Sequence, residues 1–166
     1  MNKIKKMEFF KFKPIGVIKT PFTKIPPPYQ PPESGSGNFK VILFPEYKDG
    51  LFLLDRFKYI YLIYFLNKSR DFTLSVKPPW TDKKVGLFSS RSPRRINPIG
   101  LSVVKIKKIA ENIIYTSPID VYDETPLLDI KPYIKDLDSK EDANYGWLEE
   151  TKDLDHLLLH IKGIPH

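Results

Sequence analysis

Short runs of β-branched and aromatic residues, separated by turn residues at fairly regular spacing, occupy most of the chain between residues 14 and 121. The runs are residues 14–20, 40–44, 59–66, 72–77, 85–88, 99–109 and 112–121. Residues of these types favour strands, and the Gly, Pro, Asn and Asp residues between them favour tight connections. Such a pattern is typical of an antiparallel barrel or sandwich. We therefore predict a mainly β fold, a small antiparallel β-barrel with a C-terminal helix.

The longest apolar run, YIYLIYFL at residues 59–66, is apolar on both faces, which predicts a central strand buried on both sides. The preceding residues 45–57 predict one short helix. Near the end of the chain, apolar residues at spacings of 7, 4 and 3 predict an amphipathic helix that packs against the barrel; they are Trp147, Leu154, Leu158 and Ile161. We divide the chain into a basic tail (1–13), a barrel domain (14–148) and a C-terminal amphipathic helix (149–166).

The composition excludes several classes of site. Cysteine is absent, which removes disulfides, thiol nucleophiles and thiolate metal sites. His156 and His160 stand four residues apart on the expected helix, but they lack the HExxH context of a zinc site, so we expect no metal. The sequence also lacks a Walker A motif, a GxGxxG motif and any run of about 18 apolar residues. We expect a soluble, cytoplasmic protein without a membrane span.

The charge is distributed unevenly along the chain. Residues 1–108 contain 22 Lys and Arg against 7 acidic residues, whereas residues 109–166 contain 5 against 13, which together give the net charge of +7. A basic region of this size favours an anionic partner, most plausibly a nucleic acid. The alternative, a lysine-rich surface that only faces water, fits the charge equally well.

Two polar segments carry the chemistry that the rest of the chain lacks. The first is SSRSPRRINP (89–98), where Pro93 and Pro98 restrict a loop that presents Arg91, Arg94 and Arg95. Guanidinium groups held in this way suit a carboxylate or phosphate ligand, but a basic hairpin tip exposed to water explains the same residues. The second segment, DETPLLDIKPY (123–133), we interpret as a polar turn. Its carboxylates suit ribose hydroxyls or an ammonium group, and the alternative is a turn that is merely capped by Asp and Thr.

Five segments together resemble the TsaA/TrmO-type β-barrel methyltransferases. In chain order they are PIGVIKTPF, PEYKDGL, GLFSSRSPRRINPIGLSVVKI, DETPLLDIKPYI and YGWLE, which span residues 14–149. The resemblance implies an enzyme that uses S-adenosylmethionine to methylate N6-threonylcarbamoyladenosine at position 37 of tRNA. It also implies a homodimer whose cofactor cleft lies at or near the interface.

The resemblance implies site residues by position. The residues that match the family's cofactor site are Pro28, Tyr29, Gln30, Asn67, Lys68, Arg91, Leu101, Asp123, Glu124, Thr125 and Pro126. Transfer of a methyl group to N6 requires that this nitrogen lose a proton, for which Asp123 or Asp129 is the candidate base. Tyr133 and Asn97 are candidates for orienting the nitrogen. Arg94, Arg95 and Lys131 are the candidates for contacts to RNA.

The chain departs from the family at some of these positions, and the departures leave two other functions open. Tyr29, Asn67 and Glu124 replace arginine, histidine and glycine, while Arg94 and Ile96 replace phenylalanine and proline. One alternative is a methyltransferase with the same cofactor that acts on a small molecule or another RNA. The other is a non-catalytic barrel that binds nucleic acid electrostatically.

Overall fold

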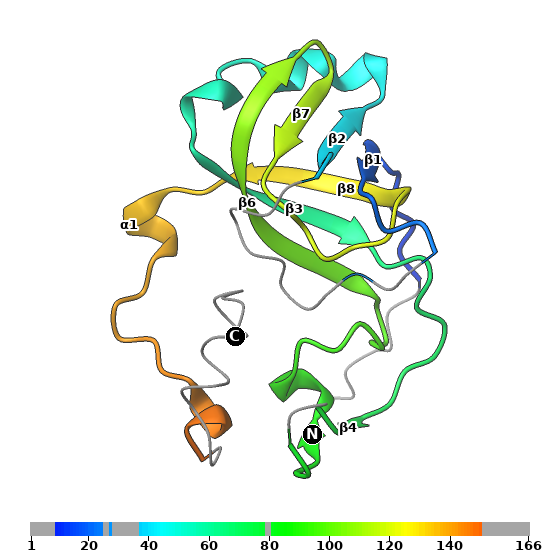
Figure 1. Ribbon diagram of the computed structural model, residues 1–166, viewed down its shortest axis with the longest axis vertical. Coiled ribbons are helices and arrows are strands. Elements are labelled where there is room, and N and C mark those ends of the chain that lie inside the picture. The colour runs from blue at the N-terminus through cyan, green and yellow to red at the C-terminus, as the bar shows by residue number, and fades with distance from the viewer. Residues whose placement is uncertain (1–8, 25–26, 28–36, 79–80, 151–166) are drawn as a thin grey trace, which may run out of the picture.

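The computed structural model describes residues 9–24, 27, 37–78 and 81–150, and it shows a closed six-stranded antiparallel barrel (Figure 1). The strands follow the order β1-β2-β7-β6-β3-β8 around the barrel. Their bounds are β1 (Gly16–Lys19), β2 (Lys40–Leu43), β3 (Tyr59–Phe65), β6 (Ile99–Ala110), β7 (Ile113–Thr116) and β8 (Thr125–Pro132). The predicted mainly β fold is confirmed.

The barrel encloses a core of aliphatic side chains contributed by alternate residues of each strand. Ile18, Val41, Leu62, Ile114 and Leu127 are each almost completely buried. This alternation follows from the pleat of a strand, which turns successive side chains to opposite faces. The β-branched residues that identified the strands in the sequence therefore fill the barrel.

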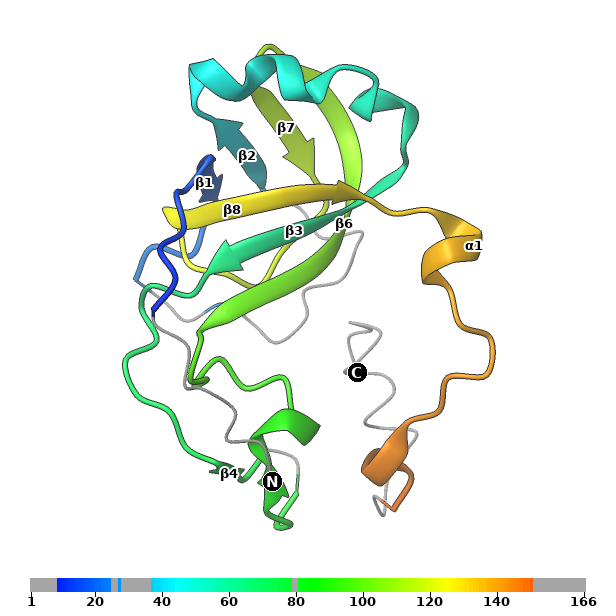
Figure 2. The same ribbon diagram turned by 180° about the vertical axis from the view of Figure 1, so that it is seen from behind.

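Strand β3 is buried on one face only, which corrects the prediction that it is buried on both. Ile60, Leu62 and Tyr64 point into the core, whereas Tyr61 and Ile63 are partly exposed on the outer surface. An antiparallel barrel has only one interior, so the outer apolar side chains of β3 lie on its surface. β3 lies between β6 and β8, as Figures 1 and 2 show.

Most of the segment interpreted as a polar turn is a strand. Only Asp123 and Glu124 form the turn, and β8 begins at Thr125 and pairs with both β1 and β3. The register with β3 shifts between Ile63 and Tyr64, which are paired with Asp129 and Leu127. This bulge accommodates a polar, proline-containing sequence within the sheet.

A second, smaller unit extends from the barrel between β3 and β6, and we call residues 67–98 the arm. It contains the two-stranded sheet of β4 (Ser75–Val76) and β5 (Val85–Gly86), followed by the 3₁₀ helix η3 (Leu87–Ser89). The predicted strand at 72–77 shrinks to two residues because Phe72 and Leu74 are exposed and lack a core to pack on. The arm leaves the barrel at the end where β1 and β3 end and β6 and β8 begin, which we call the loop rim (Figure 1).

The helices in the described residues are all short. Instead of one helix between β2 and β3, the structure has two 3₁₀ helices, η1 (Pro45–Leu51) and η2 (Leu54–Arg56). After β8 come α1 (Lys135–Asp138) and the 3₁₀ helix η4 (Gly146–Glu150). The predicted C-terminal helix falls almost wholly on residues 151–166, outside the described residues. Within the described part of the chain, no helix is long and apolar enough to cross a membrane.

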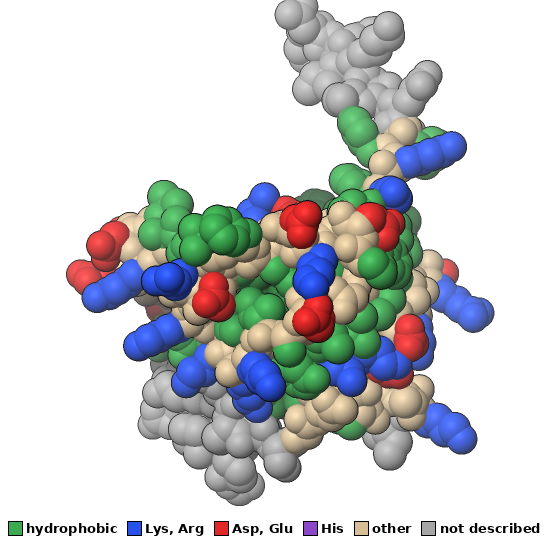
Figure 3. All heavy atoms as spheres, turned by 90° about the horizontal axis from the view of Figure 1, so that it is seen from above, with side chains coloured by type: hydrophobic (Ala, Val, Ile, Leu, Met, Phe, Trp, Pro, Cys, Tyr) green, Lys and Arg blue, Asp and Glu red, His purple; other side chains and the backbone are tan. Residues whose placement is uncertain are grey.

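Figure 3 looks onto the end of the barrel that is opposite the arm. Basic and acidic side chains are interspersed there among apolar ones, and Lys48 forms an ion pair with Glu111 of the β6–β7 turn. Among its described residues, this face therefore carries no patch of a single charge sign.

Candidate functional site

Three segments that are far apart in the sequence meet at the loop rim: residues 67–69, 91–95 and 120–125. Ser69 Oγ donates a hydrogen bond to the Pro93 carbonyl at 2.8 Å. This bond joins the first segment to the loop of residues 89–98, which we call the arginine loop. Lys68 Nζ lies 4.6 Å from the centroid of the Tyr122 ring, which joins the first segment to the third. The structure thus brings the predicted residues Lys68, Arg91 and Asp123 to one end of the barrel.

The arginine loop is held by one of its own arginines. Arg95 donates to the Ser90 carbonyl at 2.9 Å, with longer contacts of 3.5 Å to the carbonyls of Leu87 and Ser92. Its guanidinium also lies 5.9 Å from the centroid of the Phe88 ring. These contacts satisfy carbonyls at the end of η3 and favour a loop-stabilising role for Arg95 over the predicted contact to RNA. Arg91 and Arg94 are exposed on the loop that Arg95 holds.

The segment after α1 is tied to the same loop. Trp147 Nε1 donates to the Ser89 carbonyl at 2.8 Å, and Lys83 forms an ion pair with Glu150. A link between residues about sixty positions apart restricts the arm at the point where the arginine loop begins. Trp147, which the sequence placed on a packing helix, is instead a contact of the arm.

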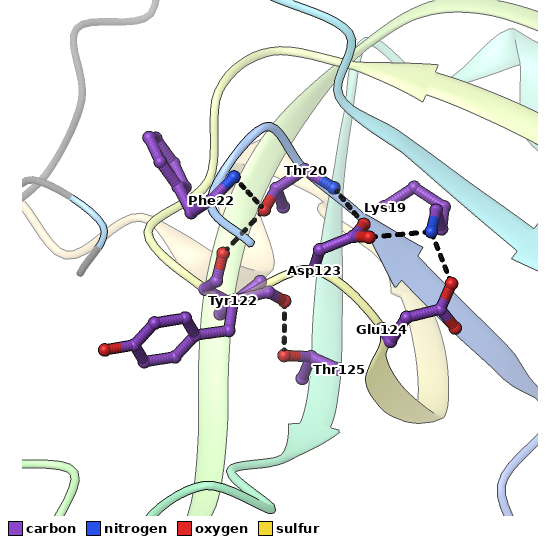
Figure 4. Close-up of polar contacts among 8 residues, drawn as sticks. Lys19, Thr20, Phe22, Tyr122, Asp123, Glu124 and Thr125 are labelled. Atoms are coloured by element: carbon purple, nitrogen blue, oxygen red, sulfur yellow. Dashed lines mark hydrogen bonds and ion pairs between the residues drawn. The ribbon is translucent and has the colours of Figure 1, made fainter. Parts of the chain in front are cut away.

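The turn at 120–125 is anchored to the end of β1, as Figure 4 shows. Lys19 Nζ lies 2.7 Å from Asp123 Oδ2, and the Thr20 amide donates to Asp123 Oδ1 at 3.0 Å. Thr20 Oγ1 donates to the Val121 carbonyl at 2.9 Å. Both oxygens of the Asp123 carboxylate are therefore engaged in holding the turn.

These contacts also determine the charge of Asp123. Burial raises the pKa of its carboxyl, but the hydrogen bonds from Lys19 and the Thr20 amide outweigh that effect and leave the pKa below its ordinary value. A carboxylate that is ionised and doubly hydrogen-bonded is a weak proton acceptor. The geometry therefore favours a positioning role for Asp123 over that of a base.

Glu124 occupies the position where the resembled family has glycine, and its backbone explains that preference. Its φ is 65°, in the left-handed region that glycine adopts without steric cost. The carboxylate forms an ion pair with Lys19, and the side chain is 63% exposed. Glu124 therefore lies beside β1. The next residue closes the turn, because Thr125 Oγ1 donates to the Tyr122 carbonyl at 2.7 Å.

Sequence reasoning missed a buried hydroxyl beneath the rim. Tyr64 shares a hydrogen bond of 2.8 Å with Ser102 Oγ, and burial raises the pKa of Tyr64 to about 12. The charge of Asp120 raises this pKa further, whereas the bond to Ser102 and the charge of Arg91 lower it. The available signal was a tyrosine opposite Gly100 at an inward-facing position of β3, where the other inward-facing residues, Ile60 and Leu62, are aliphatic.

A second group of predicted residues lies on the outer surface of the sheet. Leu101 and Asp129 flank Ile63 from the two neighbouring strands, and Lys131 Nζ lies 2.8 Å from Asp129 Oδ2. Tyr133 packs on Tyr61 with ring centroids 5.5 Å apart. Because a strand rises by about 3.3 Å per residue, Asp129 is roughly 13 Å along β8 from the turn. The two candidate bases are therefore well separated.

The remaining predicted residues lie apart from these two groups or outside the described residues. Asn97 is exposed, and its carbonyl accepts a hydrogen bond from the Ile99 amide at 2.7 Å. Pro126 is partly buried in β8 beside Val17 of β1. Pro28, Tyr29 and Gln30 lie outside the described residues, as do the three histidines. In the part of the chain that the structure describes, no three His, Asp or Glu residues are grouped as metal ligands.

A family model described as the tRNA-methyltransferase O N-terminal domain matches residues 17–139. The chain belongs to this family. The match runs from β1 through α1 and includes all three segments of the loop rim, so the predicted family is confirmed.

The relatives of this TrmO-family chain carry two kinds of name. A protein of Pyrococcus abyssi named "probable S-adenosyl-L-methionine-binding protein" is 39% identical over 141 residues, which cover 84% of this chain and 77% of the relative. The tRNA (adenine(37)-N6)-methyltransferase of Escherichia coli is 30% identical over 156 residues, which cover 87% and 66%. The crystal structure of TrmO from Pseudomonas aeruginosa superposes with a TM-score of 0.69 at 28% identity and covers 85% of this chain but 62% of the crystallised one.

Proposed function

We propose that this chain is an S-adenosylmethionine-dependent methyltransferase that methylates N6 of adenosine 37 in tRNA, and that its acceptor is N6-threonylcarbamoyladenosine. The names of the relatives support the cofactor and the position in tRNA. The threonylcarbamoyl group is the finer part of the proposal and rests on the sequence resemblance. The structural observation that carries the proposal is the convergence of the 67–69, 91–95 and 120–125 segments at the loop rim.

The side chains at the rim fit the chemical groups of S-adenosylmethionine. The cofactor has a carboxylate, an ammonium, ribose hydroxyls and a sulfonium. Arg91 and Asn67 offer hydrogen-bond donors, Asp120 offers a carboxylate, and Tyr122 offers an aromatic face. When bound, the cofactor supplies an electrophilic methyl group.

The task of this chain's residues is then mainly alignment. Lys19, Asp123 and Thr125 hold one wall of the site, and Arg95 holds the other. We propose Asp129 as the group that accepts the proton from N6, because its side chain is 44% exposed whereas that of Asp123 is 14% exposed. The Asp129 carboxylate pairs with Lys131 and accepts a hydrogen bond from the Ile130 amide, so Lys131 would have to move aside as the acceptor binds. Tyr133 would orient the nitrogen from the same face of the sheet. Arg94 would bind a phosphate or the threonyl carboxylate.

We further propose that the protein acts as a cytoplasmic homodimer. Ile99, Leu101 and Val103 project from the outer face of β6 and are 39%, 61% and 48% exposed. Partly exposed Tyr61 and Ile63 extend this apolar strip onto β3. A continuous apolar strip of this kind is typical of a protein interface. A partner copy here would cover the whole strip, including Leu101, a predicted cofactor residue.

The test is methyl transfer from labelled S-adenosylmethionine to three tRNAs. One carries N6-threonylcarbamoyladenosine at position 37, one carries unmodified adenosine, and one carries guanosine there. We expect transfer to the first tRNA only. Mass spectrometry of the digested product should show the added methyl group on the modified nucleoside.

Other outcomes discriminate between the functions. Transfer to unmodified adenosine 37 would retain the position in tRNA and overturn the proposed acceptor. Transfer to none of the tRNAs, with cofactor binding intact, would point to another acceptor. RNA binding without cofactor binding would favour the electrostatic binding module.

A further inference from the structure

The loop rim holds a cation on an aromatic face. Lys68 Nζ lies 4.6 Å from the centroid of the Tyr122 ring, within the range of a cation–π interaction. Lys68 follows β3, whereas Tyr122 precedes β8, so the two groups reach the site from different segments. Lys68 is exposed and Tyr122 is partly buried.

The aromatic ring is the fixed member of this pair. The Tyr122 carbonyl accepts a hydrogen bond from Thr125 Oγ1 at 2.7 Å, and the next residue, Asp123, is held by Lys19 and by the Phe22 carbonyl. Figure 4 shows the Tyr122 ring pointing away from the Lys19–Asp123 contact. The anchored turn therefore holds the partly buried phenol ring on the side away from Lys19.

The ammonium is the exchangeable member. The Lys68 ammonium is a strongly hydrated point charge on a flexible four-carbon side chain. The hydration that it regains on leaving the ring offsets much of the loss of the ring contact, so the exchange costs little free energy in either direction. A weakly hydrated cation of similar size would use the same ring face better, as quaternary ammonium ligands do in aromatic sites. The sulfonium of S-adenosylmethionine is such a cation.

We propose that the Tyr122 ring binds the sulfonium of S-adenosylmethionine, and that the Lys68 ammonium occupies this place in the cofactor-free protein. The inference rests on the proposed function and adds a residue that the family resemblance did not supply. It assigns Lys68 the role of a competing cation that leaves the ring when the cofactor arrives.

The ring therefore distinguishes the cofactor from its product. S-adenosylhomocysteine has a neutral thioether in place of the sulfonium, so it lacks the charge that the ring attracts. Tyr122 stabilises the methyl donor relative to the spent cofactor, and the return of Lys68 to the ring favours release of the product.

Calorimetric titration of the full chain with S-adenosylmethionine and with S-adenosylhomocysteine tests this role. For Tyr122→Leu we expect the Kd of S-adenosylmethionine to rise about three- to thirty-fold, with little change for S-adenosylhomocysteine. Tyr122→Phe keeps the ring face and should retain the wild-type preference. Lys68→Met removes the competing ammonium and should strengthen binding of S-adenosylmethionine. Thermal melts without ligand establish that each variant is folded.

Several results would overturn the inference while leaving the proposed function intact. One is an equal loss of affinity for both ligands in Tyr122→Leu, which indicates that the residue only shapes the loop. Another is an unchanged ratio of the two dissociation constants. Weaker binding of S-adenosylmethionine by Lys68→Met would show that Lys68 is a ligand and no competitor. If the wild-type chain binds neither compound, the proposed function fails together with the inference.

Discussion

Lys19 Nζ lies 2.7 Å from Asp123 Oδ2, across 104 positions of sequence. The contact joins the last residue of β1 to the turn that precedes β8, and the Thr20 amide occupies the other carboxylate oxygen at 3.0 Å. Because β1 and β8 are also paired as neighbours, the turn is fixed by the barrel itself. Asp123 thus anchors the loop that carries Tyr122 to the barrel.

Replacement of Lys19 by Met should loosen this turn. We expect a loss of about 1 kcal/mol in the free energy of unfolding, since the ion pair is partly exposed and screened by water. Amide hydrogen exchange of residues 120–125 should accelerate, and cofactor affinity should fall. Lys19→Arg keeps the charge and serves as the control. Unchanged exchange in Lys19→Met would show that the turn is held by other contacts.

The same pair predicts how stability depends on pH. The pKa of Asp123 lies below 3.8, so its contribution is complete above that pH and is lost as the pH falls through the lowered pKa. The pKa of Lys19 lies above 10.5 because it donates hydrogen bonds to Asp123 and Glu124, so its contribution is lost only as the pH rises through the raised value. Lys19→Met should therefore lose less stability on acidification than the wild type. An equal fall in the melting temperature of wild type and variant on acidification would contradict this prediction.

Glu124 allows the cost of its backbone conformation to be measured. Glu124→Ala keeps a Cβ at φ 65° and loses the ion pair, whereas Glu124→Gly loses the ion pair but relieves the conformation. We expect Glu124→Gly to be more stable than Glu124→Ala by about 1 kcal/mol in urea unfolding. Cofactor binding should survive both changes, because Glu124 turns toward Lys19. Loss of binding in both variants would instead make Glu124 a cofactor ligand.

Gly100 is required because the ring of Tyr64, its partner on β3, occupies the space of a Cβ. A Cβ at this position would lie 2.0 Å from Tyr64 Cε2, and the ring is enclosed by the core. Gly100→Ala should therefore cost about 1–3 kcal/mol in the free energy of unfolding. At Gly50 an added Cβ meets no described atom within 4 Å, so Gly50→Ala is the matched control. Equal stability of the two variants would show that Tyr64 has room to move.

The apolar strip on β6 predicts the behaviour of a charged variant. Val103→Asp should convert the proposed dimer to a monomer in light scattering, since an unpaired carboxylate is costly in an apolar interface. Phe52→Asp alters an apolar residue at the C-terminal end of η1 that is 83% exposed, against 48% for Val103, and should leave the dimer intact. A Val103→Asp protein that stays dimeric would place the interface elsewhere.

The strands of the barrel were predictable because their signal is local. Residues 14–20, 40–44 and 99–109 are each rich in the β-branched and other apolar residues that favour strands, and the structure places β1, β2 and β6 there. The prediction for residues 123–133 was wrong, because a strand that begins at a charged turn and contains a bulge has the composition of a loop. Burial of one face of β3 depends on closure of the barrel, which no single strand reveals.

The sequence predicted which segments form the site, but it did not predict the contacts between their side chains. The family match placed Lys68, Arg91 and Asp123 together, and the structure brings their segments to one rim. The partners of these residues were hidden, because Lys19 and Tyr64 read as ordinary strand residues in the sequence. Their importance arises from pairing across the barrel, with 104 positions between Lys19 and Asp123.

The bonds from Arg95 to carbonyls of its own loop have an evolutionary consequence. The loop is held by Arg95 together with Ser69 and Trp147, so the exposed residues Arg91 and Arg94 are free to vary without unfolding it. Acceptor preference in this family could drift through residue 94 while the scaffold of the loop is inherited unchanged. A new specificity would then require few substitutions and no new architecture.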